Sequence, residues 1–361
     1  MQSYIKGLNG IRAFAIIFVL FTHLDTFQNI SNPFIKQAMQ LLFGPGVEIF
    51  YVLSGFLITK ILLTEKYVKN NISLTNFYVR RILRIIPCLY IFIFTLIILN
   101  YFSIITIKTP SIVFALLFLT NFVNDVYANP ILSHTWSLAV EEHFYLIFPF
   151  LVKYLNFNKL FIYLILILVG GIIFQFLIYK HSLFSHTFNP SKWTFANIHI
   201  IIIGCLFAML EFSFIKKYEN SIFKEKFFFL FLTIIMYCSL LLINNSLLFN
   251  ILSKSICWIA VGYVLSWFFY NQNSVIVKIF EVSPLVYIGK ISYSLYVWQG
   301  LFLRTGPGGE LWIQKFPQNI ILSFICAIIS YEVIEKKILI FKNKFTVNNN
   351  KLIQKIKIII S

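Results

Sequence analysis

The sequence predicts an all-α, polytopic membrane protein with about ten transmembrane helices and with both termini in the cytoplasm. Three observations predict this fold class. Of the 361 residues, 59% are hydrophobic and only 12% are charged. Apolar runs long enough to cross a bilayer recur along the chain, and Lys and Arg are concentrated in alternate connections between them. A soluble domain is typically about half apolar and about a quarter charged, so this composition excludes one.

The candidate spans are apolar runs that approach the roughly 17–25 residues a transmembrane helix needs. The first run begins with basic residues, as a signal peptide does, but Arg12 stands at its edge and no small-residue cleavage pattern follows His23. We therefore interpret it as a retained span. The eleven candidates are 8–28, 43–63, 85–105, 112–123, 138–155, 159–179, 195–213, 227–247, 251–270, 285–303 and 318–340.

The positive-inside rule decides between ten and eleven crossings. With ten, the basic cluster at 216–226 and the lysine-rich end of the chain both face the cytoplasm, as do most of the 30 Lys and Arg residues. With eleven, those two segments would face opposite sides. We therefore predict a short outer-side or re-entrant element at 112–123, a transmembrane domain over 1–341 and a basic cytoplasmic tail over 342–361.

The formal net charge of +17 is explained by the membrane. Lys and Arg mark cytoplasmic loops and contact anionic headgroups. The chain carries no nucleic-acid-binding motif and no His/Cys spacing typical of a metal site. Membrane lipids are therefore expected partners, whereas nucleic acid and metal are not.

A basic group lies near the inner end of the third candidate span. Residues 77–87 read "FYVRRILRIIP", which places Arg80, Arg81 and Arg84 within one helical turn of each other. Two interpretations stay open. The arginines anchor the helix to anionic lipid, or they form a clamp for phosphate, with which arginine makes bidentate contacts.

Acidic residues and histidines gather near the predicted outer ends of three spans. Ionisable groups inside spans are costly, so each is a candidate for function. A His–carboxylate pair suits general base catalysis on a hydroxyl, and a buried polar network that fixes helix packing is the alternative. The residues are His23, Asp25, Glu48, His134, Glu141, Glu142 and His143.

Arg12 and His23 are eleven residues apart on the first span. Eleven residues rise about 16 Å and rotate three turns plus about 20°. The two side chains are therefore expected on one face of the helix, near opposite sides of the membrane. Such a face would suit a shaft that holds an extended thioester cofactor, with phosphates at the inner end and the acyl group at the outer end.

Six motifs, in order along nearly the whole chain, resemble those of the acyltransferase-3 family of membrane O-acyltransferases. The first, "LNGIRAFAIIFVLFTH", carries the Arg-x10-His pattern at Arg12 and His23. The pattern Trp-Ser-x-x-x-Glu-Glu falls on Trp136, Ser137, Glu141 and Glu142. The six motifs are "LNGIRAFAIIFVLFTH", "GPGVEIFYVLSGFLIT", "FYVRRILRIIP", "HTWSLAVEEHFYLIFP", "IGKISYSLYVWQ" and "SYEVIEKK".

The resemblance implies transfer of an acyl group, most often acetyl, from cytoplasmic acetyl-CoA to a hydroxyl of a cell-surface or lipid-linked saccharide. It implies His23 as general base, with Glu141 or Glu48 orienting the imidazole and Glu142 beside them. Direct transfer is the simpler route, and a covalent acyl-histidine stays open as the alternative. The implied phosphate-binding residues are Arg12, Arg80, Arg81 and Arg84, and Trp136, Ser137, Tyr293 and Trp298 are expected to contact substrate or to support the site. The implied location is the bacterial cytoplasmic membrane.

Two positions depart from the family pattern: Gln299 stands where the family often has His, and His143 stands where Gln is common. We also expect a stand-alone transmembrane domain, without the esterase-like domain that is fused to some relatives. Acyl transfer to a small molecule that is not a glycan is an alternative activity. A transporter is the alternative from another class, but it predicts matched, Gly/Pro-broken halves, and the chain shows no such repeat.

Overall fold

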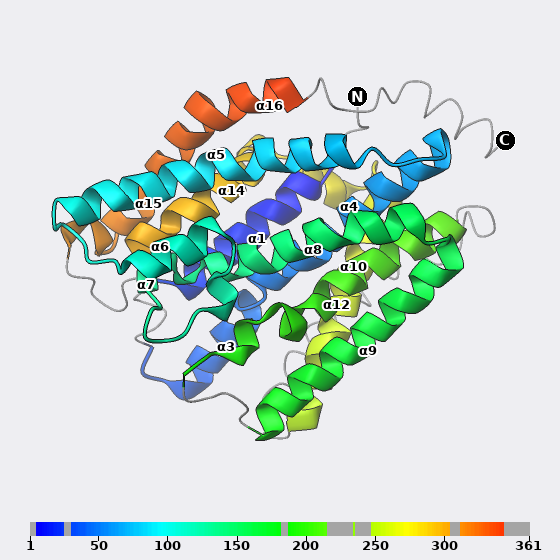
Figure 1. Ribbon diagram of the computed structural model, residues 1–361, viewed down its shortest axis with the longest axis horizontal. Coiled ribbons are helices and arrows are strands. Elements are labelled where there is room, and N and C mark those ends of the chain that lie inside the picture. The colour runs from blue at the N-terminus through cyan, green and yellow to red at the C-terminus, as the bar shows by residue number, and fades with distance from the viewer. Residues whose placement is uncertain are drawn as a thin grey trace.

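The computed structural model describes residues 5–24, 30–181, 187–214, 234, 247–303 and 311–342, and the regular elements in these ranges are helices (Figure 1). Within these ranges, four helical segments are long and apolar enough to cross a membrane: Gly46–Lys69, Leu74–Tyr101, Phe157–Lys180 and Pro190–Phe212. The expectation of an all-α chain with several spans is confirmed for this part of the protein. The main elements are α1 (Leu8–Thr22), α3 (Pro33–Phe43), α4 (Gly46–Lys69), α5 (Leu74–Tyr101), α6 (Thr109–Leu116), α7 (Pro130–Ser133), α8 (Thr135–Tyr154), α9 (Phe157–His181), α10 (Thr194–Phe214), α12 (Leu247–Tyr270), α13 (Val275–Ile279), α14 (Ser283–Leu303), α15 (Gln318–Ile329) and α16 (Lys336–Lys342).

Several boundaries differ from the predicted ones. Helix α5 has 28 residues, about 42 Å at 1.5 Å per residue, and begins eleven positions before the predicted span. Helix α6 has only 8 residues, about 12 Å, which is too short to cross the hydrocarbon core. This agrees with a short element at 112–123. Apart from Ile234, candidate span 227–247 lies outside the described residues until α12 begins, and so do Asp25 and the predicted tail beyond Lys342.

Helices α4 and α10 make a close contact inside the bundle. A methyl group at Gly204 would overlap the Val52 carbonyl, so only glycine allows this approach. Small residues let helix backbones meet in membrane proteins, where van der Waals contact replaces the hydrophobic effect as the driving force. The same pair of helices carries a salt bridge from Lys60 Nζ to Glu211 Oε2 at 2.6 Å.

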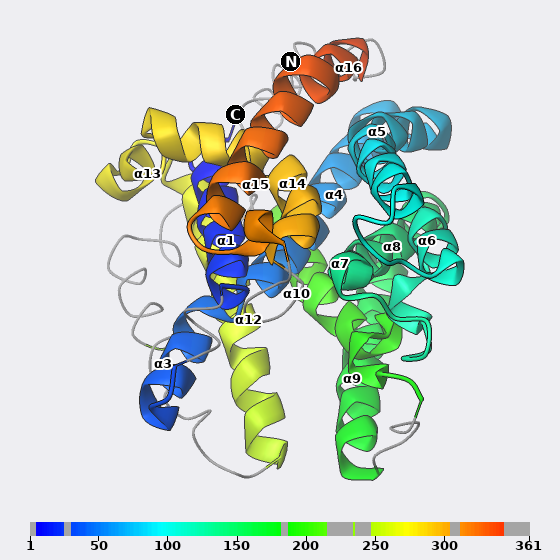
Figure 2. The same cartoon turned by 90° about the vertical axis from the view of Figure 1, so that its left-hand side faces the viewer.

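Helices α1 and α14 form a second close pair, seen side by side in Figure 2. A Cβ at Gly289 would overlap the Asn9 carbonyl, so the register of these two helices is fixed near their N-termini. Helix α14 also packs against α15. The contact matters for the site because it holds the residues after Gly289 next to the first turns of α1.

The hairpin between α4 and α5 is held by buried polar contacts. Arg80 Nη2 lies 3.7 Å from Glu65 Oε2, and the two side chains are 10% and 2% exposed. The other Glu65 oxygen accepts from the Ser73 backbone N–H at 3.3 Å. Lys66 Nζ donates to the Val152 carbonyl at 2.7 Å, near the C-terminal end of α8. A cation at this position satisfies carbonyls that have no partner within their own helix.

We predict that Arg80 and Glu65 stabilise the hairpin as a coupled pair. Replacing either residue by Gln should lower the free energy of unfolding by about 1–3 kcal/mol, because the remaining charge stays buried without its partner. The double variant should lose at least about 1 kcal/mol less than the sum of the two. Thermal unfolding of the purified protein in detergent measures this, with Lys69→Gln on the same hairpin as the control. Additive losses would contradict the pairing.

Candidate active site

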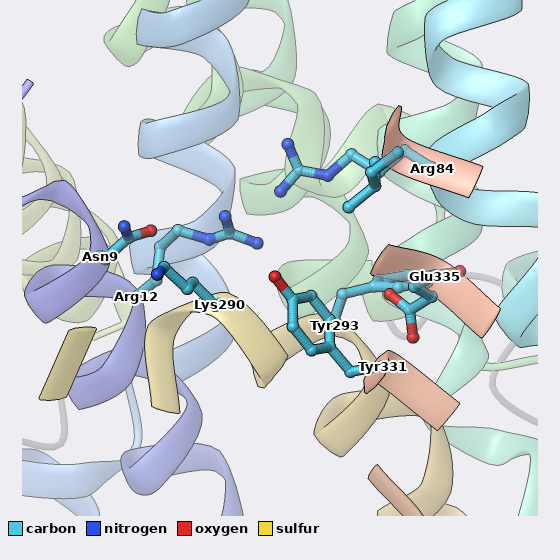
Figure 3. Close-up of a pocket in the computed structure, with 8 residues that line it drawn as sticks. Asn9, Arg12, Arg84, Lys290, Tyr293, Tyr331 and Glu335 are labelled. Carbon is cyan, nitrogen blue, oxygen red and sulfur yellow. The ribbon is translucent and has the colours of Figure 1, made fainter. Parts of the chain in front are cut away.

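A cavity of about 150 Å³ lies where α1, α5, α14 and the last helix meet. Its volume accommodates roughly ten water molecules at 10–15 Å³ each, which suits a diphosphate-sized group. Figure 3 shows the guanidinium groups of Arg12 and Arg84 pointing toward the same space from α1 and α5. The lining residues are Asn9, Arg12, Arg84, Lys290, Tyr293, Tyr331, Glu335 and Leu339.

Packing contacts bring these side chains together from distant parts of the sequence. Tyr293 donates its phenolic hydrogen to the Ile85 carbonyl at 2.8 Å, which ties α14 to α5 next to Arg84. The contact of Gly289 with Asn9 does the same between α14 and α1. Both contacts lie within a few residues of a lining cation, so they fix where the positive groups converge.

A π-helical turn over Ser330–Glu335 supplies the fourth wall. In an α-helix, side chains four residues apart differ by about 40° in their direction around the helix axis. Tyr331, Glu335 and Leu339 would therefore spread over about 80°. A π-turn holds roughly 4.4 residues, so the angle from Tyr331 to Glu335 becomes about −30°. The two offsets nearly cancel, and all three side chains line the same cavity. The π-turn is thus a device that aligns Tyr331 and Leu339.

The cavity carries an excess of positive charge. Three cations line it, together with one carboxylate, Glu335. Glu335 accepts hydrogen bonds from the hydroxyls of Ser294 and Ser330. Among the residues that the structure describes, no ion pair within 4.0 Å involves Arg12, Arg84 or Lys290. The arrangement therefore suits an anion, and a phosphate group matches both the charge and the donors.

Glu141 lies with the basic residues. Its carboxylate accepts from the Ser54 hydroxyl at 2.9 Å and from the Tyr145 phenol at 3.2 Å. The ring of Tyr145 also lies under the Arg81 guanidinium, 4.9 Å from its carbon to the ring centroid. Arg12 is within electrostatic reach of both Glu141 and Arg81. The sequence grouped Glu141 with the outer acids, and the structure connects it to the arginines instead.

Glu142 and Arg80, which the sequence also predicted for the site, lie in different places. Glu142 is within electrostatic reach of Arg81 and of Glu141. Arg80 does not line the cavity, because its guanidinium faces Glu65. The three arginines of the motif therefore have three environments: Arg84 lines the cavity, Arg81 stacks on Tyr145, and Arg80 holds the hairpin.

His23 caps the opposite end of α1. Its Nδ1 is within hydrogen-bond distance of the Val19 carbonyl and 3.2 Å from the Thr22 hydroxyl oxygen. A carbonyl can only accept, so Nδ1 carries the hydrogen and the basic lone pair is on Nε2. The C-terminus of a helix also favours a cation, by typically 0.3–1 kcal/mol. Both effects would stabilise the imidazolium that forms when Nε2 takes up a proton.

Glu48 lies in the first turn of α4. Its Oε2 atom is buried, and no residue in the described structure hydrogen-bonds to it. Gln299 on α14 is fully buried, and neither of its amide atoms has a hydrogen-bond partner there. Buried polar atoms without partners cost free energy, which water or a ligand can offset.

The aromatic and hydroxyl residues expected near substrate support the bundle. Ser137 shares a hydrogen bond with the Tyr296 phenol, and Tyr51 donates to the Ser137 carbonyl at 3.3 Å. The ring of Trp136 meets Tyr51 edge to face at 6.4 Å between centroids. Trp298 packs against Phe92 in the same way at 5.5 Å. These contacts join α4, α5, α8 and α14 around the site.

Sequence reasoning missed Asn9, Lys290, Tyr331 and Glu335 as lining residues. Lys290 and Glu335 lie inside the motifs "IGKISYSLYVWQ" and "SYEVIEKK", which gave only the resemblance. Their ionisable side chains in apolar segments were the available signal. The described residues contain no group of three His, Cys, Asp or Glu side chains arranged to hold a metal ion.

Comparisons with known proteins agree with these features. The acyltransferase domain of the acyltransferase-3 family matches residues 5–334. O-acetyltransferase OatA of Staphylococcus aureus strain NCTC 8325 is 30% identical over 364 residues, covering 93% of this chain and 57% of that protein. OatA of strain COL matches with the same values. The chain thus spans 57% of the length of these relatives, and no solved structure matches. The chain belongs to the acyltransferase-3 family of membrane acyltransferases.

Proposed function

We propose that this protein transfers an acetyl group from cytoplasmic acetyl-CoA to a hydroxyl of a cell-surface or lipid-linked saccharide. The observation that carries the proposal is the placement of two chemically matched sites at opposite ends of α1. A cationic cavity lies beside Arg12 at its first turns, and the imidazole of His23 caps its C-terminal end. The relatives' names support the reaction class, and the acceptor is our assignment.

The topology that fits this reaction has ten crossings, with both chain termini in the cytoplasm. The α4–α5 hairpin is rich in Lys and Arg, which favours the cytoplasmic side. The start of α1, the cavity and the start of α14 then also face the cytoplasm, where acetyl-CoA is available. His23 then faces the outer side of the bacterial cytoplasmic membrane.

The length of the donor supports the same placement. Extended chains advance about 1.2 Å per backbone bond, since a residue of three bonds spans at most about 3.6 Å. The thirteen or so bonds from the thioester sulfur to the diphosphate of CoA therefore extend about 16 Å. This equals the rise of about 16 Å between Arg12 and His23. Phosphates at Arg12 and Arg84 would place the thioester beside His23.

In the proposed reaction His23 acts as general base. Its Nε2 takes the proton of the acceptor hydroxyl while that oxygen attacks the thioester carbonyl. The tetrahedral intermediate then expels the CoA thiolate, which receives the proton, and the acetyl ester remains on the acceptor. The Val19 carbonyl fixes the tautomer in place of the usual carboxylate. His23 takes one proton from the acceptor hydroxyl and gives one proton to the thiolate, so no other reactant is needed.

The carboxylates take separate roles in this proposal. Glu141, with Ser54 and Tyr145, offsets the mutual repulsion of the arginines and holds Arg81 in place. Glu142 contributes to the same balance of charge. Glu48 is assigned to the acceptor, because its buried oxygen can accept a hydrogen bond from a second saccharide hydroxyl. Arg12 and Arg84 bind the donor phosphates, and Arg81 stands behind them.

Replacing His23 by Ala should reduce acetyl transfer at least about a hundredfold, since general base catalysis contributes about 10²–10⁴. The measurement is incorporation of radiolabelled acetyl groups from acetyl-CoA into saccharide by membranes of the expressing bacterium. His143→Gln is the matched control, because Gln can keep the hydrogen bond that His143 makes with Thr194. Normal transfer by the His23→Ala protein would refute the assignment of the base.

Arg84 and Arg80 offer a matched test of the donor site, because they lie one turn apart on α5 and differ in their contacts. Arg84→Gln should raise the KM for acetyl-CoA about tenfold or more and leave the KM for acceptor unchanged, since charge-assisted contacts contribute about 1.5–3 kcal/mol. Arg80→Gln should lower thermal stability but leave the KM of the folded protein unchanged. Equal changes of KM in both variants would show that the cavity does not select the donor.

A further inference from the structure

Lys290 is the cation of the cavity to which the proposed reaction assigns no role. It lies one residue after Gly289, whose contact with the Asn9 carbonyl fixes this part of α14 against α1. Its side chain is exposed at the mouth of the cavity, and Figure 3 shows it beside Arg12.

The depth of Lys290 separates it from the two arginines. The helix register places Gly289 level with Asn9, so the backbone of Lys290 lies about two residues, or about 3 Å, before Arg12 toward the start of α1. A donor whose diphosphate lies between Arg12 and Arg84 continues past Lys290 with its ribose and adenine. The phosphate group next in line at that level is the 3′-phosphate of the ribose.

The electrostatic surroundings leave the ammonium available for an anion. Glu332 is within electrostatic reach of Lys290, but its carboxylate pairs with Lys336 Nζ at 2.6 Å and accepts from Tyr287 at 3.3 Å. A phosphate monoester carries about −1.5 to −2 charges at neutral pH. Lysine meets it as a compact point charge with three rotatable donors, whereas arginine suits the flat, two-oxygen contact of the diphosphate.

We propose that Lys290 binds the 3′-phosphate of the donor's adenosine and makes the protein select CoA over dephospho-CoA. This inference rests on the proposed use of acetyl-CoA. It assigns α14 a part in donor specificity, separate from the arginines of α1 and α5. The Asn9 amide and the Tyr331 phenol also line the cavity and are polar groups suited to a ribose phosphate.

The test measures binding of CoA and of dephospho-CoA by calorimetry, with the protein in lipid nanodiscs at fixed ionic strength. The parent should bind CoA about tenfold more tightly than dephospho-CoA, as one charge-assisted contact predicts. Lys290→Gln should weaken CoA binding about tenfold and leave dephospho-CoA binding unchanged. Removing the lysine charge and removing the 3′-phosphate should therefore not have additive effects on binding. Lys278→Gln, an exposed lysine on α13 outside the cavity, should change neither.

Three results would overturn the inference. Equal weakening of both ligands would mean that Lys290 acts on the diphosphate, and unchanged binding of both would mean that it contacts neither phosphate. If the parent binds CoA and Arg84→Gln weakens that binding, either result leaves the proposed function standing. If the parent itself fails to bind CoA, both proposals are wrong.

Discussion

The constraint on which the rest of this structure depends is the cost of holding several arginines together in an apolar bundle. Each charge taken from water into a helical bundle has to be matched by polar partners or by a water-filled cavity. Glu141 and the Tyr145 ring are the polar partners near Arg81, whereas Arg12 and Arg84 line a cavity. A site with surplus positive charge is stable only if water or an anion can enter it, so stability and the proposed donor binding would have one physical origin.

Much of the fold could be predicted from the sequence because the bilayer restricts it. Long apolar runs in lipid have to be helices, and basic residues select a side. The relative placement of Arg12 and His23 along and around the first helix could also be predicted, because one continuous helix has a known rise and rotation. The charge balance also predicts a short element at 112–123, where α6 has only 8 residues.

The parts that could not be predicted depend on contacts between helices. Helix periodicity puts Arg80 and Arg84 near one face, but Glu65 on another helix pairs with Arg80. The depth of Glu141 follows from its partner Ser54, not from its distance to the end of α8. The pattern of apolar residues does not predict a π-turn, so the alignment of Tyr331 with Leu339 could not be predicted either.

The contact between His23 and the Val19 carbonyl has a consequence for genetics. In a carboxylate–histidine pair, a point mutation can remove the group that sets the tautomer. Here that group belongs to the main chain, which every amino acid other than a helix breaker supplies equally. Substitutions at Val19 therefore change packing and keep the orienting oxygen. If His23 is the base, as proposed, a complete mutational scan of α1 would identify it and overlook its partner, which only replacement of a backbone amide by an ester would expose.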